Sequence, residues 1–275
     1  MTKARVLYVT QAMEPYLPEG ELTTKCRELP QAIQERGKEI RNFMPRYGSI
    51  NERRHQLHEV IRLSGMNLVI DDHDHPLIIK VASIPQAKMQ VYFIDNEEFF
   101  KRKSDLTDND GKAHSDNDER MIFFCKGVAE TIKKLGWAPD IIHCHGWFSS
   151  LLPMFIKNVY KDEPLFANSK VLYSMYNNHP KQKVNKKLHK KLEFENINPE
   201  YLEGLKDPEY DNLHKMGAMF SDAVIFGSDD ISDDVKKYIT EQDKPSMEFT
   251  GLEDFVEAYD KFYDMVLEND TVLAD

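Results

Sequence analysis

The sequence predicts an α/β fold: a doubly wound, Rossmann-like sheet with inserted β-hairpins and a C-terminal crossover helix. Three observations lead to this prediction. Short apolar runs alternate with amphipathic helical segments through the first 240 residues. A strand, a loop, a helix and a second strand occupy the first 45 residues. An apolar stripe at helical spacing lies near the C-terminal end.

The opening unit is a β-loop-α-β arrangement. Residues 6–10 form the apolar run of a buried parallel strand. Residues 22–36 carry apolar side chains at helical spacing, and Gly37 follows as a stop. Residues 40–44 form the second strand, closed by Pro45.

The middle of the chain changes character. Four strand-like runs separated by turn-prone residues predict hairpins beside the sheet; these runs are 60–63, 68–70, 77–81 and 90–94. The polar residues 101–119 predict an exposed loop. Asp116 or Asn117 is the expected cap of the helix that follows and ends at Gly136.

The alternation continues to the end of the chain. Strands are predicted at 141–143, 170–176 and 223–226, and helices at 148–157, 213–220 and 252–267. We therefore expect one domain over residues 1–240, followed by a linker and an amphipathic helix, residues 241–275, packed on the same domain.

Composition argues against several classes of protein. The net charge of −11 weighs against a nucleic-acid or anionic-membrane partner, because dense Lys and Arg drive binding to phosphates. Three cysteines without CxxC spacing favour neither a disulfide framework nor a zinc ribbon. No apolar stretch approaches about 18 residues, and the start lacks the apolar run of a signal peptide, so we expect a cytoplasmic location. No cofactor or metal is predicted, and the expected ligand is small or carbohydrate-like.

The candidate chemistry lies in Pro139-Asp-Ile-Ile-His-Cys-His-Gly-Trp-Phe-Ser-Ser-Leu151, where a strand runs into a polar corner. His143 and His145 are either a ligand pair or structural histidines, and the structural interpretation is favoured. Cys144 is a nucleophile or, more in keeping with its surroundings, a buried thiol. Trp147 stacks on a sugar ring or packs under the loop.

Two charged segments have similar alternatives. Residues 71–75, Asp-Asp-His-Asp-His, have a metal-like composition, but a solvated hairpin tip is favoured because no fourth ligand is apparent. The lysines of residues 181–191 are expected to form a solvated helix face; an acidic partner or a sugar phosphate is the other interpretation.

Separated segments, in their order and spacing, resemble the N-terminal half of bacterial glycogen synthases and plant starch synthases. The segments are Arg5-Val-Leu-Tyr-Val9, Glu14-Pro-Tyr16, Leu29-Pro30, Met44-Pro-Arg-Tyr-Gly48, Tyr92-Phe-Ile-Asp-Asn96, Asp118-Glu-Arg-Met-Ile-Phe-Phe124, Pro139-Asp-Ile-Ile-His143, Lys215-Met-Gly217 and Ser221-Asp-Ala-Val224. That family consists of ADP-glucose-dependent retaining glucosyltransferases, so the resemblance implies the N-terminal half of a GT-B fold.

The sequence departs from the family where the family handles its sugar donor. The family's Lys-Thr-Gly-Gly-Leu loop aligns with Pro18-Glu-Gly-Glu-Leu22, which loses the lysine and keeps Gly20. Glu19 and Glu21 would each repel a diphosphate by roughly a few kcal/mol at about 4 Å.

The same loss repeats at two further motifs. The family's His-x-His-Asp-Trp-His reads His143-Cys-His-Gly-Trp-Phe148, and its Thr-x-His-Asn reads Ser174-Met-Tyr-Asn177. The resemblance implies no catalytic residue and gives these candidates for substrate binding: Gly20, His143, His145, Trp147, Tyr176 and Asn177.

The family also carries a second domain of about 200 residues, which nothing in this sequence matches. We therefore expect a protein of glycogen metabolism that is inactive by itself and that binds α-glucan or maltooligosaccharide, or regulates. The face that a second domain would cover is the expected site for a protein partner or self-association. The alternative is an ADP-glucose-dependent α-1,4-glucan glucosyltransferase that works with a second polypeptide.

Overall fold

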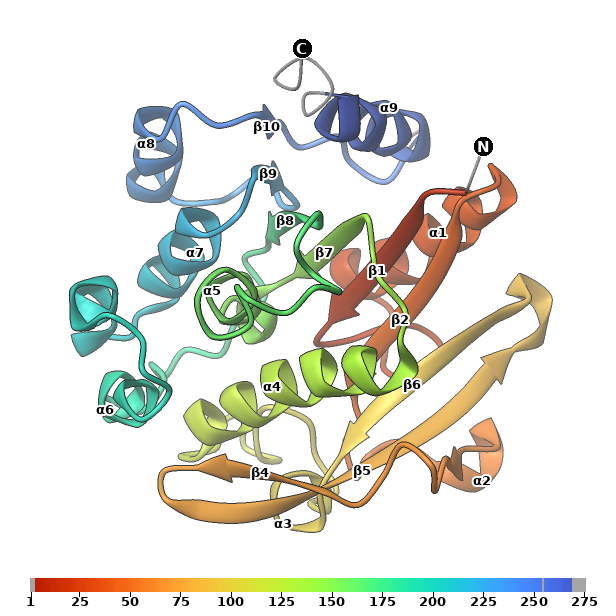
Figure 1. Ribbon diagram of the computed structural model, residues 1–275, viewed down its shortest axis with the longest axis vertical. Helices are drawn as coiled ribbons and strands as arrows, with labels where there is room; N and C mark the ends of the chain where they lie inside the picture. The colour runs from red at the N-terminus through yellow and green to blue at the C-terminus, as the bar shows by residue number, and fades with distance from the viewer. Residues whose placement is uncertain (1–2, 254, 269–275) are drawn as a thin grey trace.

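Helices cover both faces of a ten-stranded sheet in the computed structural model, which describes residues 3–253 and 255–268 (Figure 1). The strand order is β10-β9-β8-β7-β1-β2-β6-β5-β3, with β4 paired to β5. Every pair from β10 to β6 is parallel, and the chain crosses over between β1 and its two neighbours β2 and β7. This is the doubly wound α/β arrangement that the sequence predicted.

The opening unit forms as predicted. Strand β1 (Arg5–Thr10) leads through a loop to helix α1 (Glu21–Glu35), and β2 (Glu39–Pro45) then pairs in parallel with β1. Gly37 has a φ of +98°, the left-handed conformation that glycine adopts readily after a helix. Helix α1 packs on β1 and β2.

The hairpin region needs two corrections. Strand β5 (His73–Ile84) pairs antiparallel with β3 (His58–Glu59), with β4 (Met66–Ile70) and with β6 (Met89–Asp95). The run 90–94 is not outside the parallel sheet, because β6 also pairs in parallel with β2. Residues 60–63 form turns and end without a strand. Two short helices flank this region, α2 (Glu52–His55) and α3 (Glu97–Phe100).

Residues 101–119 are only partly the exposed loop that their polarity predicted. Helix α4 (Asn117–Leu135) begins inside this stretch, and Asn117 and Asp118 are buried. Asp116 occupies the N-cap position but makes no side-chain capping bond. Its carboxylate instead pairs with Arg102. The sequence therefore predicted the N-cap position of Asp116 correctly, but not the partner of its side chain.

The second half alternates as expected. Its strands are β7 (Ile141–His145), β8 (Lys170–Met175), β9 (Ala223–Phe226) and β10 (Ser246–Met247). Its helices include α5 (Leu152–Met154), which continues into a π-helical turn (Phe155–Val159), and α6 (Leu188–Glu193), α7 (Tyr210–Met219) and α8 (Asp233–Glu241). The predicted helix 148–157 is therefore a series of short helical pieces.

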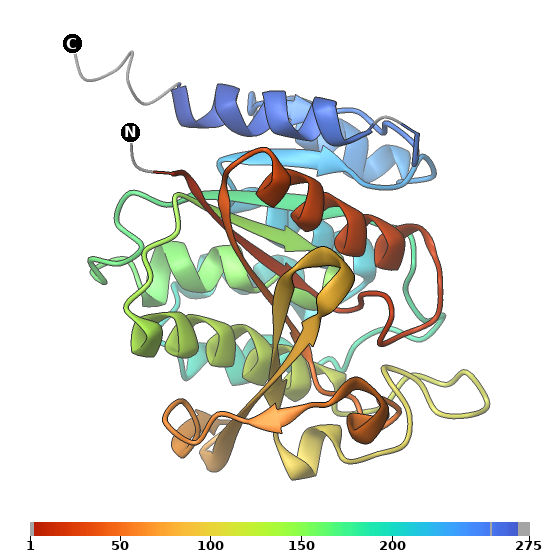
Figure 2. The same cartoon turned by 90° about the vertical axis from the view of Figure 1, so that its right-hand side faces the viewer.

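Helix α9 (Phe255–Glu268) lies against α1 at the far end of the chain (Figure 2). It buries Phe255, Tyr259, Tyr263 and Val266. Lys38, just before β2, pairs with Asp260 at 2.6 Å and with Asp264 at 2.9 Å. The packing agrees with the predicted crossover helix, although residues 1–2, 254 and 269–275 of the two expected domains lie outside the described residues.

Among the helices of the described residues, none has the length and apolar character needed to cross a membrane.

Candidate functional site

The candidate site lies beyond the carboxyl ends of β1 and β8, where a doubly wound sheet places its ligands. A cavity of about 390 Å³ opens there, and a smaller one of about 220 Å³ shares His179 with it. The larger cavity, which we call the edge cavity, lies between the loop after β1, the loop after β8 and residues 105–107. Its lining mixes apolar and polar side chains, among them Gln11, Leu17, Pro18, Tyr47, Leu106 and His179.

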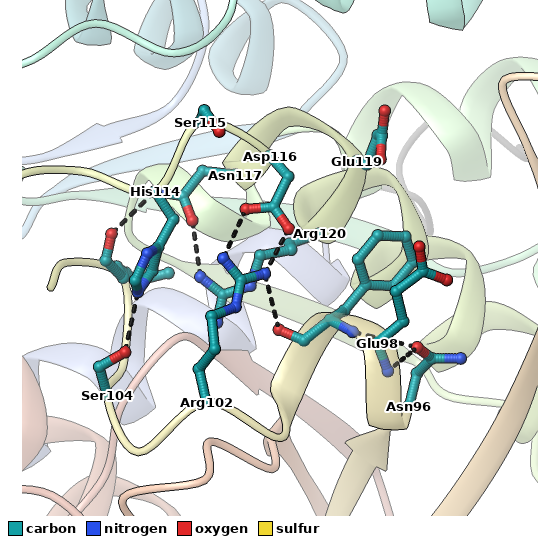
Figure 3. Close-up of polar contacts among 12 residues, drawn as sticks. Asn96, Glu98, Arg102, Ser104, His114, Ser115, Asp116, Asn117, Glu119 and Arg120 are labelled. Atoms are coloured by element: carbon teal, nitrogen blue, oxygen red, sulfur yellow. Dashed lines mark hydrogen bonds and ion pairs between the residues drawn. The ribbon is translucent and has the colours of Figure 1, made fainter.

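One wall of the edge cavity is held in place by Arg120 of α4 (Figure 3). The buried guanidinium donates to the Asp105 carbonyl at 2.8 Å and to Asn117 Oδ1 at 2.7 Å. The Asn117 amide in turn donates to the Leu106 carbonyl at 2.9 Å. Residues 105 and 106 are thus fixed by buried hydrogen bonds, which makes this part of the loop a rigid wall.

The Arg120 guanidinium is unusual because no carboxylate of the described residues accepts from it. Its carbon lies 5.1 Å from the Phe100 ring centroid and 5.7 Å from that of Tyr47, a lining residue of the edge cavity. Burial lowers the pKa of Arg120 to about 10. The group therefore stays charged at neutral pH, stabilised by carbonyl oxygens and aromatic faces.

Two polar contacts continue the wall outward. Arg102 forms an ion pair with Asp116, and Ser104 bonds to Nε2 of His114 at 2.9 Å (Figure 3). Burial, assisted by the charges of Arg120 and Arg102, lowers the pKa of His114. His114 is therefore mostly neutral at pH 7 and does not act as a cation beside the cavity.

The histidine motif lies under the site, in the interior. His143 Nδ1 is 2.6 Å from the Tyr263 hydroxyl, and its Nε2 is 2.7 Å from Ser174 Oγ. His145 Nδ1 is 3.1 Å from the Tyr176 hydroxyl. Burial is the main reason that the pKa of His143 is lowered, and it lowers the pKa of His145 to about 3. Both imidazoles are neutral at physiological pH.

The predicted substrate-binding residues separate into two groups. His143, His145, Trp147 and Tyr176 are 0% exposed, so in this structure they do not line an open cleft. The rings of Phe148 and Tyr210 pack on Trp147 at 5.4 and 5.0 Å, which corresponds to the packing interpretation of that residue.

Gly20 and Asn177 reach the surface. Gly20 precedes α1 with an extended backbone, and an added Cβ would meet only Thr23 at an ordinary 3.6 Å. Asn177 follows β8, lines the smaller cavity and donates to Asp230 Oδ2 at 2.6 Å. Substrate contact by these two residues stays a prediction.

Gly146 shows why the interior is closed. Its φ is +79°, and an added Cβ would lie 2.6 Å from Gln11 Oε1 and 3.0 Å from Leu22. Gln11 Oε1 accepts from the Phe148 backbone N–H at 3.2 Å. The Gln11 side chain therefore fills the space beside Gly146, where the family that the sequence resembles carries an aspartate.

Sequence reasoning missed Lys25, a fully buried lysine of α1. Its ammonium donates to the Gly227 carbonyl at 3.0 Å and lies 4.6 Å from the Phe249 ring centroid. Burial lowers its pKa, partly offset by the charge of Glu21. Lys25 lies on the apolar face of α1 with Leu22 and Leu29. A lysine on the apolar face of a predicted helix is the sequence signal that could have identified it.

The start of α1 carries acidic groups. Glu21 is its first residue, and Glu21 Oε2 accepts from the Ser228 hydroxyl at 2.6 Å. Glu19 and Pro18 are exposed just before it. A helix N-terminus attracts anions, but these carboxylates already supply negative charge at that end.

The remaining candidates lie outside the lining of the edge cavity. Residues 71 and 72 form the tip between β4 and β5 with positive φ angles, and the described residues contain no group of three metal-ligating side chains. Burial raises the pKa of the Cys144 thiol, as expected of a buried thiol. The other lysines of residues 181–191 are exposed as predicted, although only residues from 188 onward are helical. Lys191 is the exception, because it is buried and pairs with Asp118 at 2.6 Å.

Comparison with known proteins gives consistent matches. The family model for the starch synthase catalytic domain matches residues 5–251. A glycogen synthase of Chlorobium luteolum is 38% identical over 216 residues, which cover 77% of this chain and 42% of that protein. A glycogen synthase of Chlorobaculum parvum is 36% identical over 80% of this chain and 45% of its own. The chain thus spans less than half the length of these curated relatives.

A solved structure gives the same fold. The catalytic domain of starch synthase IV from Arabidopsis thaliana, bound to ADP and acarbose, superimposes with a TM-score of 0.73 at 18% identity. The match covers 91% of this chain and 52% of the plant chain.

Proposed function

The chain belongs to the starch synthase catalytic domain family, and on that premise we propose that it acts in glycogen metabolism as a glucan-binding or regulatory protein with a diverged donor site. We propose further that residues 1–275 do not transfer glucose by themselves. The edge cavity is the proposed site for an α-glucan or maltooligosaccharide.

The observation that carries this proposal is the closed interior beside the cavity. Tyr176 stands where the family's donor-side histidine is expected, and it is fully buried against His145. Gly146 stands where the family has an aspartate, and Gln11 occupies the adjacent space. Glu19 and Glu21 replace the neutral residues of the family's phosphate loop. Each change removes a contact to a sugar nucleotide or opposes its charge.

The edge cavity has the properties that a sugar chain requires. Leu17 and Pro18 supply accessible apolar surface, while Asn178 and His179 supply hydrogen-bonding groups. A volume of about 390 Å³ lies within the ordinary range of small-ligand sites. Arg120 holds one wall rigid, which reduces the entropy cost of binding.

Calorimetry with maltoheptaose tests the binding proposal. Thr107→Trp places a large side chain in the lining of the edge cavity and should weaken binding at least tenfold. Lys103→Trp adds the same side chain at an exposed position outside that lining and should bind as the unsubstituted protein does. Absence of maltoheptaose binding would remove the glucan-binding function and leave a role in protein interaction.

Incubation with radiolabelled ADP-glucose and glycogen tests the catalytic proposal. We expect no incorporation into glycogen. Incorporation by the purified protein alone would contradict the proposed inactivity.

The alternative is an ADP-glucose-dependent α-1,4-glucan glucosyltransferase that works with a second polypeptide. The curated relatives are glycogen synthases, and His143, His145, Trp147 and Asn177 match the family's motifs. Incorporation that appears only after a fractionated lysate of the source cells is added would favour this alternative.

Association with a protein partner or with a second copy is also proposed. Size-exclusion chromatography with light scattering measures self-association directly. A monomer at all concentrations would exclude association with a second copy.

A further inference from the structure

A second cavity of about 460 Å³ lies at the opposite end of the sheet from the edge cavity. Its walls are Lys3 before β1, Gln34 in the last turn of α1, residues 38–41 at the start of β2 and residues 88–90 at the start of β6. Because β1, β2 and β6 run parallel, their first residues meet at the edge farthest from the candidate site. We call it the basic cavity.

Positive charge exceeds negative charge in this wall. The lining holds Lys3, Lys38, Arg41 and Lys88 against a single carboxylate, Glu39. Asp260 and Asp264 of α9 neutralise Lys38. The exposed ammonium groups of Lys3 and Lys88 have no ion pair within residues 3–253 and 255–268. The excess is notable in a chain of net charge −11.

The carboxylate of Glu39 is shared among several donors. It lies 3.7 Å from Arg41 and 3.5 Å from Arg5, and it accepts from the Trp137 indole at 2.7 Å. The Arg41 guanidinium also lies 5.3 Å from the Trp137 ring centroid, which fixes its plane. One carboxylate cannot neutralise two guanidinium groups, so this wall retains a positive charge.

Two polar atoms of the lining residues are buried without a hydrogen-bond partner among the described residues. They are Nε of Arg41, a donor, and Oε1 of Gln34, an acceptor. The Gln34 amide is oriented by its own Nε2, which donates to the Lys88 carbonyl at 3.3 Å. Unsatisfied buried polar atoms are costly, and a ligand that offers both an acceptor and a hydroxyl donor would relieve them after a small side-chain adjustment.

We propose that the basic cavity binds a small phosphate ester that carries hydroxyl groups. The phosphate lies against Lys3, Lys88 and Arg41, because guanidinium and ammonium groups form charge-assisted hydrogen bonds with phosphate oxygens. A hydroxyl of the ligand donates to Gln34 Oε1. The site is independent of the proposed glucan function, since it shares no lining residue with the edge cavity.

Binding is measured by calorimetry at constant ionic strength with three probes: glycerol 3-phosphate, inorganic phosphate and glycerol. We expect glycerol 3-phosphate to bind several-fold more tightly than phosphate, and glycerol not to bind. Gln34→Met removes the acceptor at nearly constant size and should reduce the preference for the ester over phosphate. Absence of saturable binding of glycerol 3-phosphate at millimolar concentration would overturn the proposal.

The double variant Lys3→Ala with Lys88→Ala locates the site. It should weaken glycerol 3-phosphate binding at least tenfold. The matched control, Lys181→Ala with Lys190→Ala, removes the same charge from exposed positions elsewhere and should stay within twofold. Equal affinity of the first variant and the unsubstituted protein, or an equal loss in both variants, would show that the ester binds elsewhere or through overall charge.

Discussion

Gly146 is a residue whose conformation and surroundings both require the absence of a side chain. Gly146→Asp would restore the family's residue type at that position. We expect it to lower the free energy of unfolding by about 2–4 kcal/mol, because it forces a left-handed aspartate and displaces the Gln11 side chain that satisfies the Phe148 N–H. Urea denaturation measures the loss.

Gly65→Ala is the matched control for that variant. Gly65 has a φ of +87°, and an added Cβ would meet nothing within 4 Å. It isolates the backbone cost, roughly 1 kcal/mol. Equal losses in the two variants would show that the crowding at Gly146 contributes nothing.

The buried histidines predict a pH dependence of stability. Burial lowers the pKa of both His145 and His214 to about 3, whereas the unfolded chain has the ordinary value near 6.5. Between these values the unfolded state binds protons that the native state does not. The contribution of each histidine to the free energy of unfolding is therefore fully present above about pH 6.5. It decreases as the pH falls, by about 2 kcal/mol for each histidine between pH 7 and pH 5.

Urea denaturation at pH 7 and pH 5 measures this dependence. His143 is a third buried histidine whose pKa is lowered, so His214→Gln removes one of three such groups and should reduce the difference between the two pH values by about a third, whatever its effect at pH 7. A free energy of unfolding that stays constant from pH 7 to pH 5 would contradict the neutral, buried state of these imidazoles.

At the scale of the element, helix α9 is joined to the central strand β7 by Tyr263. Tyr263→Ala should cost about 3–5 kcal/mol, because it removes a buried ring and leaves His143 Nδ1 without its hydroxyl partner. Hydrogen exchange should then accelerate in α9 more than in β1 or β7.

Two substitutions separate the contributions to that loss. Tyr263→Phe keeps the ring and should cost about 1–2 kcal/mol for the hydrogen bond. Lys261→Ala changes an exposed residue of the same helix that pairs with Glu257 on the helix surface, and it should cost less than about 0.5 kcal/mol. A loss from Lys261→Ala that matches the one from Tyr263→Ala would indicate that surface ion pairs, not docking, stabilise α9.

The wall of the edge cavity depends on one buried arginine. Arg120→Met should lower the free energy of unfolding by about 3 kcal/mol or more, since Asn117 and the Asp105 carbonyl lose a buried charged donor. It should also expose residues 101–116 to limited proteolysis and weaken maltoheptaose binding.

Arg120→Lys distinguishes charge from geometry. A lysine keeps the charge but cannot direct two donors at Asn117 and Asp105 in a fixed plane. We expect no recovery of binding. Full recovery by lysine would mean that the positive charge alone positions the wall.

These elements also show what the sequence can and cannot predict. Strand β9 and helix α1 were located from local apolar patterns, because their burial repeats along the chain. Strand β6 was assigned to a hairpin, since its apolar run does not reveal that β2 pairs on its other edge. The structural roles of Arg120 and Lys25 were missed because tertiary packing alone brings their partners to them. Arg120 donates to the Asp105 carbonyl of a loop that folds back, and Lys25 donates to the Gly227 carbonyl, about 200 residues later.

At the scale of the whole molecule, the sequence favoured buried, structural roles for His143, Cys144 and His145, but it did not give the partners that bury them. The sequence pattern of a histidine at a strand end is the same whether the side chain faces a cleft or contacts a tyrosine from a helix 120 residues later. Tyr176, Gln11 and helix α9 close the interior together, and no single motif contains that information. The charge of the chain was equally uninformative about its local distribution, since a net −11 includes the positive wall of the basic cavity.

Thermal unfolding tests the proposed selectivity of the whole molecule in one experiment. A ligand that binds only the native state at 100 times its Kd adds about 2.7 kcal/mol of stability, which for a chain of this size raises Tm by several degrees. Maltoheptaose should produce this shift, because the edge cavity exists only when the loops after β1 and β8 and residues 105–107 are assembled. ADP-glucose should produce none, because carboxylates occupy the start of α1 and aromatic side chains fill the interior beside it. A shift with ADP-glucose as large as the one with maltoheptaose would contradict the proposed loss of the donor site. Thr107→Trp should abolish the shift with maltoheptaose.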